Sequence, residues 1–261
     1  VELDVLDDGG GAVDVGTSNA LDVLTDAGQT VPDSGGPVDA GGPDIVTIDI
    51  GAVDSAKNAP LWLLSIDNGG KLSDKWLQMV DVKTGKASNL CKLNTQDSYP
   101  SLTFSRDGIL FASNNTQDRL DMIDPCTCKI TPVGFFGYSF IPGITSNQGA
   151  GLYGIENTAD ITLKIDEKTG KGTKVGEFGY NFGNGGATWS DTFGAMYAID
   201  GTSDTLYKLD PKTGKATVLV KLSMNFGTVG MELHPSNDVI YACSSAATLL
   251  SVDPLTGTVS T

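Results

Sequence analysis

From residue 45 onward, short runs of β-branched, leucine and aromatic residues alternate with turn residues at intervals of about 8 to 12 positions. One unit contains four such runs, at 143–148, 151–156, 160–166 and 172–178. Each run has the length and residue types of a strand, and the gaps between runs hold glycine, aspartate, asparagine or threonine. The pattern therefore predicts units of four short antiparallel strands.

A seven-residue turn motif recurs at a nearly constant spacing, at 79–85, 122–128, 164–170, 208–214 and 251–257. Its anchoring aspartates are spaced by 43, 42, 44 and 43 residues, and they are Asp81, Asp124, Asp166, Asp210 and Asp253. In such a motif aspartate caps the turn, proline presets φ where it is present, and the final glycine takes the left-handed conformation. We expect these aspartates at equivalent turns between the third and fourth strands of each unit.

Four antiparallel strands at this period are typical of a β-propeller blade. We predict an all-β fold, a β-propeller of about five four-stranded antiparallel blades spanning residues 45–261. An acidic N-terminal extension, 1–44, precedes it. The alternating segment 45–50 is expected to be the innermost strand of the first blade, and the last blade ends in a short outer strand at 258–261. The alternative is a larger ring of about six or seven blades with further repeats beyond this chain.

The repeat resembles the blades of bacterial surface-layer and quinoprotein-like propellers. In those blades a Gly-Leu-x-Phe strand leads to a Leu-Tyr strand and then to Leu-Tyr-x-Ile-Asp-Pro-x-Thr-Gly, a pattern that residues 206–214 follow with leucine for isoleucine. The resemblance implies an architecture and little more, because propellers host many unrelated activities.

The extension differs from the repeats in charge and composition. The net charge of the chain is −15, and residues 1–54 hold Glu2 and eleven aspartates without any lysine or arginine. Residues 1–44 contain no aromatic residue, so they bury too little apolar surface to offset the entropy of ordering. The run 32–43 resembles the Asp-Ala-Gly-Pro stalks of surface lipoproteins of myxobacteria and their relatives. The resemblance implies a tether at the cell surface, and the acidic charge argues against nucleic acid as a partner.

A short motif of apolar and acidic residues occurs twice in the extension, at 3–10 and 21–28. One interpretation is a docking strand that adds to an exposed sheet edge. Its apolar residues would be Leu3, Val5, Leu6, Leu21, Val23 and Leu24. The alternatives are a plain acidic linker and a calcium site formed by Asp4, Asp7 and Asp8, whose spacing is not that of an EF-hand loop.

The chain has four cysteines, Cys91, Cys126, Cys128 and Cys243, and one histidine, His234. Cys128 replaces the turn glycine, and we expect it to form a disulfide with Cys126, which implies an oxidising compartment. Cys91 and Cys243 are expected to be small buried residues on an outer and a central strand. His234 precedes a proline and is expected in a turn, and no cysteine–histidine pair has zinc-site spacing.

The connections between blades share a theme of aromatic residues, and the turns between the second and third strands share an aspartate. Both kinds of connection emerge on one face of a propeller, so we expect a ligand-binding face there. Its residues would be Tyr138, Phe140, Tyr180, Phe182, Phe226, Asp74, Asp118, Asp160 and Asp204. Aromatic rings beside carboxylates suit a sugar, a cation or a protein partner. The alternative is that the aromatics pack between blades and the aspartates serve only as turn residues.

These features favour a non-enzymatic binding or adhesion module, exported by a bacterium to the cell surface or beyond. Val1 does not begin an export signal, so we expect that any signal has already been removed or was never there. The alternative is a subunit of an extracellular filament whose N-terminal strand docks into another copy. A propeller enzyme would need several histidines or arginines near its axis, and this chain has one histidine and two arginines, Arg106 and Arg119. We expect no cofactor apart from the calcium option, no membrane span, and a protein, a glycan or another copy as partner.

Overall fold

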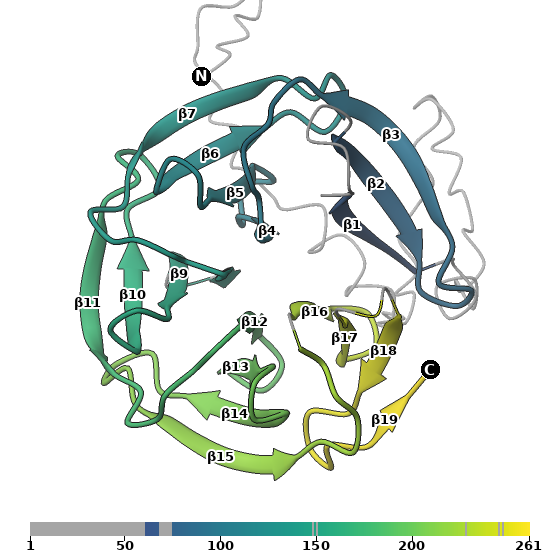
Figure 1. Ribbon diagram of the computed structural model, residues 1–261, viewed down its shortest axis with the longest axis vertical. Helices are drawn as coiled ribbons and strands as arrows, with labels where there is room; N and C mark the ends of the chain where they lie inside the picture. Colours follow the sequence, from purple (N-terminus) through teal and green to yellow (C-terminus); the bar gives the residue numbers. More distant parts are fainter. Residues whose placement is uncertain are drawn as a thin grey trace, which may run out of the picture. The chain divides into compact units, whose positions relative to one another are not determined.

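The computed structural model describes residues 61–67, 75–147, 149, 151–227, 229–244, 246 and 248–261. These residues belong to one compact unit, 54–261. In that part of the chain the structure contains nineteen short β-strands and no helix (Figure 1). The predicted extension 1–44 and the predicted strand 45–50 lie outside the described residues.

The strands form five sheets, numbered here as blades 1 to 5 in chain order. Blade 1 has β1 (Trp62–Asp67), β2 (Lys75–Asp81) and β3 (Ala87–Leu93). Blade 2 has β4 (Ser101–Phe104), β5 (Leu110–Asn114), β6 (Arg119–Ile123) and β7 (Ile130–Phe135). Blade 3 has β8 (Gly143–Asn147), β9 (Gly151–Glu156), β10 (Ile161–Ile165) and β11 (Gly172–Glu177). Blade 4 has β12 (Gly185–Ser190), β13 (Ala195–Asp200), β14 (Thr205–Leu209) and β15 (Ala216–Lys221). Blade 5 has β16 (Gly230–His234), β17 (Val239–Cys243), β18 (Leu249–Val252) and β19 (Val259–Ser260).

The predicted propeller of five blades is confirmed. Consecutive strands in each sheet are antiparallel neighbours, as the four-strand repeat requires. Figure 1 shows β4, β12 and β16 nearest the axis and β7, β11 and β15 on the outside. The outer strand of blade 5, β19, is only two residues long, as expected. Four of the motif aspartates lie at the predicted turns between the third and fourth strands, and Asp81 lies at the turn between the last two described strands of blade 1.

The apolar core is divided among the junctions between blades. One buried cluster lies at each junction from blades 1 and 2 to blades 4 and 5. At the junction of blades 3 and 4, for example, Ile155 and Phe178 are fully buried among residues from both sheets. Burying each such side chain contributes roughly 1.5–3 kcal/mol to stability. Each blade is therefore stable only against its neighbours, which explains why the repeat must be nearly regular.

The motif turns also make the outer contacts between blades. In blade 3, Asp166 Oδ1 accepts the N–H groups of Lys168 and Thr169, both at 2.9 Å, and Gly170 has a φ of 73°. A Cβ on Gly170 would lie 2.3 Å from the carbonyl oxygen of Gly134 in β7, the outer strand of blade 2. Only glycine therefore fits the turn at this close approach. The pairs Gly214 with Gly176 and Gly257 with Val220 repeat the contact at the next two junctions.

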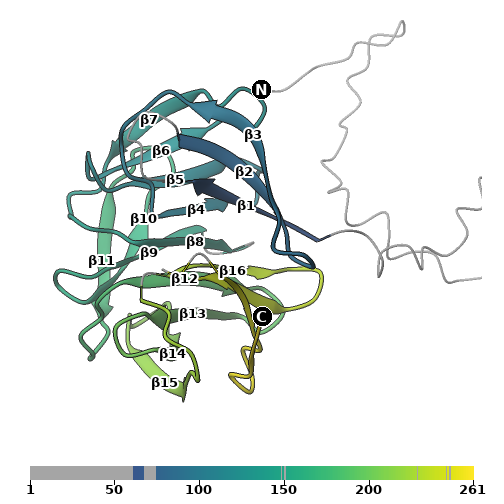
Figure 2. The same cartoon turned by 45° about the vertical axis from the view of Figure 1, so that its right-hand side comes forward.

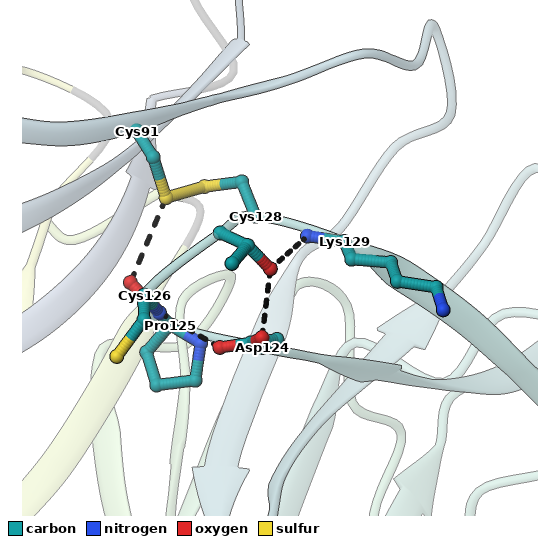
Figure 3. Close-up of a disulfide and its surroundings, with 7 residues drawn as sticks. Cys91, Asp124, Pro125, Cys126, Cys128 and Lys129 are labelled. Atoms are coloured by element: carbon teal, nitrogen blue, oxygen red, sulfur yellow. Dashed lines mark hydrogen bonds between the residues drawn. A yellow bond between two sulfur atoms is a disulfide. The ribbon is translucent and has the colours of Figure 1, made fainter.

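The predicted disulfide between Cys126 and Cys128 is wrong, because Cys128 is bonded to Cys91 with a Cα–Cα distance of 5.7 Å. Cys128 occupies the place of Gly170, with a φ of 55°, and this position faces the outer strand of the preceding blade. Cys91 lies on that strand, β3. Figure 3 shows the sulfur of Cys126 pointing away from the disulfide, and Cys126 is a free, exposed thiol. The expectation that Cys91 and Cys243 are plain buried residues is also wrong, since Cys91 is bonded and Cys243 is exposed.

Candidate functional site

The predicted binding face is built from the crossovers that join consecutive blades. We call the end of the ring that carries residues 136–142, 178–184 and 222–229 the crossover face; the turns between the second and third strands lie at the same end. Figure 2 gives a second view of the ring, turned by 45°. Asp118, Asp160 and Asp204 lie in these turns with φ values of 51°, 52° and 46°.

Each of these aspartates binds the backbone of the neighbouring crossover. Asp160 Oδ1 accepts the N–H of Phe182 at 2.9 Å, and its own carbonyl accepts the N–H of Phe178 at 2.8 Å. The equivalent carboxylate bonds join Asp118 to the N–H of Phe140 at 3.3 Å and Asp204 to the N–H of Phe226 at 2.8 Å. The carboxylates therefore fix the crossovers, which is the structural role that the sequence left open. Asp74 lies outside the described residues.

The predicted aromatics divide into two groups. Phe182 and Phe226 are 1% and 0% exposed, so the expectation that they form an exposed surface is wrong. They are buried because they fill the junctions between blades; the ring of Phe182 lies 4.5 Å from that of Phe178 and 4.7 Å from that of Tyr207. Phe140 and Tyr180 are each 43% exposed, and Tyr138 is half-buried. Two of the predicted aromatics thus remain available on the crossover face.

Phe140 differs from its two equivalents in conformation as well as exposure. Its φ is 56°, in the left-handed region that bulky side chains rarely adopt, whereas neither Phe182 nor Phe226 has a positive φ. The next residue, Ile141, is fully buried and fills the place that the phenylalanine ring takes in the other crossovers. The backbone is therefore turned so that Phe140 projects its ring toward solvent.

The crossover from blade 1 to blade 2 is held by a charged cluster together with one aromatic residue, Tyr99. The fully buried Asp121 accepts hydrogen bonds from Tyr99 Oη at 2.7 Å, from Asn114 Nδ2 at 2.8 Å and from Arg119 Nε at 2.7 Å. Burial first, and then the bond to Asp121, raise the pKa of Tyr99. Arg119 therefore has a structural role in this cluster. The other arginine of the sequence is Arg106.

A cavity of about 690 Å³ lies at the axis, which the sequence did not predict. It is lined by residues 62–66 of β1, by the whole of β4 and by the whole of β16. None of the residues predicted for the binding face lines it. The sequence indicates that the first strand of every unit faces the axis, but it does not indicate that these strands leave a cavity between them.

Three of the titratable groups on β16 and β17 that line this cavity have shifted pKa values. Burial raises the pKa of Glu232 to about 8, opposed by its hydrogen bond with Thr188, and Oε2 of this carboxyl is fully covered. Partial burial against the cavity wall also lowers the pKa of His234 and raises that of the otherwise exposed Cys243 thiol. His234 Nδ1 accepts the N–H of Ser236 at 3.2 Å, in keeping with the expected turn role. At neutral pH these three groups are therefore mostly uncharged, and the thiol is not activated as a nucleophile.

The structure gives no test of the metal and docking predictions. The described part of the chain contains no group of three or more metal-ligating side chains. The candidate calcium ligands Asp4, Asp7 and Asp8 and the docking residues of 3–6 and 21–24 lie outside the described residues. Among the described residues, no helix is long and apolar enough to cross a membrane.

Solved structures with a similar fold include a protein of unknown function from Bacteroides thetaiotaomicron, with a TM-score of 0.56 and 14% identity over 76% of this chain. This chain spans 54% of that protein. A structure from the nidogen/laminin complex matches with a TM-score of 0.51 and 12% identity, over 73% of this chain and 72% of its own. A catalytically inactive virginiamycin B lyase from Staphylococcus aureus, with quinupristin, matches at 0.47 and 14% identity, over 77% and 73%. No family model and no curated protein matches the sequence.

These likenesses define the class of protein as a β-propeller. At such low identity they carry the fold alone, and a propeller fold does not by itself determine a function. Function must be argued from the residues of this chain.

Proposed function

We propose that this chain is an exported propeller of the cell surface that acts as a non-enzymatic binding module. It recognises a protein or a glycan through the crossover face, with Phe140 and Tyr180 as the principal contacts. Exposed aromatic rings on a rigid scaffold suit sugars and protein partners, because they offer a large apolar contact at low entropic cost.

The observation that carries the proposal is the conformation of Phe140. A positive φ costs a bulky residue about 1–3 kcal/mol and recurs where strain serves a function. Here the strain turns an apolar ring outward, although the buried alternative is realised at Phe182 and Phe226. Stability alone would favour glycine at this position.

Two further observations support the proposal. The Cys91–Cys128 disulfide is of a kind that persists in oxidising compartments, which favours export. The groups that line the axial cavity include an unactivated thiol and a histidine whose pKa burial lowers, which favours binding over catalysis. The stalk-like composition of 1–44 is consistent with display on a tether.

The test separates binding from stability at one residue. Phe140→Gly relieves the strain at φ 56°, so we expect equal or higher thermal stability together with at least tenfold weaker binding. Binding is measured with the purified full chain on a glycan array and on intact cells of the producing bacterium.

The matched control is Phe104→Gly. Phe104 is 46% exposed, close to Phe140, but it ends β4 at the opposite end of the blade. We expect this variant to keep full binding. If Phe140→Gly is less stable and binds normally, or if Phe104→Gly loses the binding instead, the crossover face is not the site.

A further inference from the structure

Three of the four cysteines lie together at the junction of blades 1 and 2. Cys91 lies on β3, and Cys126 and Cys128 lie in the motif turn between β6 and β7. Cys128 is bonded to Cys91, and Cys126 is a free, exposed thiol. The other four motif turns hold glycine at the position of Cys128, and at the position of Cys126 they hold Lys83, Lys168, Lys212 and Leu255. Both positions are therefore cysteine in this turn alone.

Hydrogen bonds hold the backbone of this turn on both sides of Cys126. The N–H of Cys126 donates to Asp124 Oδ1 at 2.9 Å, and the N–H of Cys128 donates to the carbonyl oxygen of Asp124 at 2.8 Å. Between them, Thr127 Oγ1 donates to Asp124 Oδ2 at 2.7 Å. The backbone of Cys126 is therefore fixed relative to the disulfide, while its exposed side chain can change rotamer without displacing a packed neighbour.

The disulfide sulfur that is open to this thiol is that of Cys91. Cys91 Sγ lies 3.6 Å from the carbonyl oxygen of Pro125, so the peptide group that precedes Cys126 lies against it (Figure 3). Cys91 is partly exposed, whereas Cys128 is only 5% exposed. A bond from Cys126 to Cys128 would also close a small ring that strains the disulfide geometry. Because the sulfur of Cys126 points away from the disulfide in Figure 3, its side chain must rotate before it reaches Cys91.

We propose that these three cysteines form a thiol–disulfide exchange site, in which Cys126 takes over Cys91 from Cys128. Cys126 loses its proton to water, and its thiolate attacks Cys91 Sγ. The bond between Cys91 and Cys128 breaks, its electron pair leaves with Cys128, and the Cys128 thiolate takes a proton from water. One disulfide and one thiol are present before and after the step, so it consumes no oxidant and no reductant.

The exchange moves the free thiol without opening the junction. Either bond joins the motif turn of blade 2 to β3 of blade 1, so blade 1 stays covalently connected. What changes is the place of the remaining thiol, from the exposed Cys126 to Cys128, whose position is 5% exposed. The reverse step returns the thiol to the surface. This role does not depend on the crossover face, because the motif turns lie at the other end of the ring.

Thiol labelling of the full chain tests the proposal. The folded protein is kept at neutral pH without oxygen or added thiol, quenched with acid to stop exchange, unfolded in acid and labelled with a maleimide, and peptide mass spectrometry locates the label. We expect the label to divide between Cys126 and Cys128, with Cys243 fully labelled. The matched control is Cys126→Ser, which removes only the exposed attacking thiol. In it the label on Cys128 should be lower by about tenfold or more.

Three results would overturn the proposal. The first is a label on Cys128 that is no higher in the unmodified chain than in Cys126→Ser. The second is a label that appears on Cys91 instead of Cys128, since Cys126 would then bond to Cys128 and blade 1 would be released. The third is a label on Cys128 that falls on dilution or in Cys243→Ser, because the attacking thiol would then belong to another copy or to Cys243. A share that is unchanged by dilution and by Cys243→Ser supports exchange within the cluster.

Discussion

The junction between blades 1 and 2 differs from the junction between blades 2 and 3 by one kind of contact. In both, the motif turn of the later blade meets the outer strand of the earlier one. At blades 2 and 3 the contact is between Gly170 and the backbone of Gly134. At blades 1 and 2 the same two positions hold Cys128 and Cys91, which are joined by a covalent bond.

The comparison shows that the hairpin turn determines the backbone conformation at this position, whichever residue occupies it. Cys128 keeps a φ of 55°, close to the 73° of Gly170, although cysteine gains nothing from that conformation. The left-handed residue is thus dictated by the hairpin, and the neighbouring blade then lies near enough for either a glycine contact or a disulfide. The described part of blade 1 has three strands, and its outer junction is the one that carries the covalent connection.

Removing the disulfide is expected to have the largest effect. The bond spans 37 residues, and closing a loop of that length stabilises the folded state by about 4 kcal/mol in the chain-entropy account. Cys91→Ser should lower the free energy of unfolding by about that amount in denaturant titration. Cys126→Ser, which removes the free thiol of the same turn, should leave it unchanged. Equal stability of the two variants would show that the disulfide does not hold blade 1.

The double variant Cys91→Gly with Cys128→Gly sharpens the comparison. It installs the pair that joins blades 2 and 3, and glycine suits the φ of 55° at position 128. We expect it to recover about 1 kcal/mol relative to Cys91→Ala with Cys128→Ala, whose alanine is strained at that φ. Denaturant titration under non-reducing conditions measures the difference. No recovery would mean that the two junctions are not interchangeable.

A glycine junction should fail when a single methyl group is added. Gly170→Ala combines the strain of a positive φ with a Cβ 2.3 Å from the Gly134 carbonyl oxygen, so we expect a loss of about 3 kcal/mol. Gly137→Ala has a similar φ of 76° but open space around its Cβ, and should cost about 1 kcal/mol. The difference between the two variants in thermal or denaturant unfolding isolates the contact between blades. Equal losses would show that the strained φ alone matters.

The fold could be predicted from the sequence because the repeat has a constant period and neighbouring blades pack against one another. The spacing of Asp81 and its four equivalents places every outer turn, and strands such as β9 begin and end where the apolar run does. The disulfide does not follow from the turn 124–128 taken alone, because its partner lies on the preceding blade. Cys91, Gly134, Gly176 and Val220 occupy equivalent places on successive outer strands, so the repeat itself indicated what Cys128 would meet.

The candidate site was less predictable, because side chains in equivalent crossovers have different environments. Phe140 and Phe182 occur in nearly the same local sequence, yet one is exposed and the other buried. The outcome depends on the next residue, since Ile141 is large enough to fill the junction and Gly183 is not. The cavity depends on the closure of the whole ring, and no local pattern encodes it.

The smallest effect concerns the part of the turn that the junctions share. Backbone hydrogen bonds from residues 168 and 169 lower the pKa of Asp166, and Asp210 and Asp253 are lowered in the same way, so all three stay ionised in the folded state below the ordinary aspartate range. A lowered pKa in the folded state contributes stability that is present above the unfolded value of about 3.8 and is lost as pH falls through the folded value.

Asp210→Asn retains an oxygen acceptor for the amides but cannot be protonated, so it should flatten the fall in melting temperature between about pH 4 and pH 2 without abolishing the turn. Asp107→Asn is the matched control, because that carboxylate pairs with the exposed Arg106 at 3.5 Å instead of capping a turn between blades. An acid-induced loss as steep in Asp210→Asn as in the unmodified chain would mean that the turn aspartates do not set the acid limit of the fold.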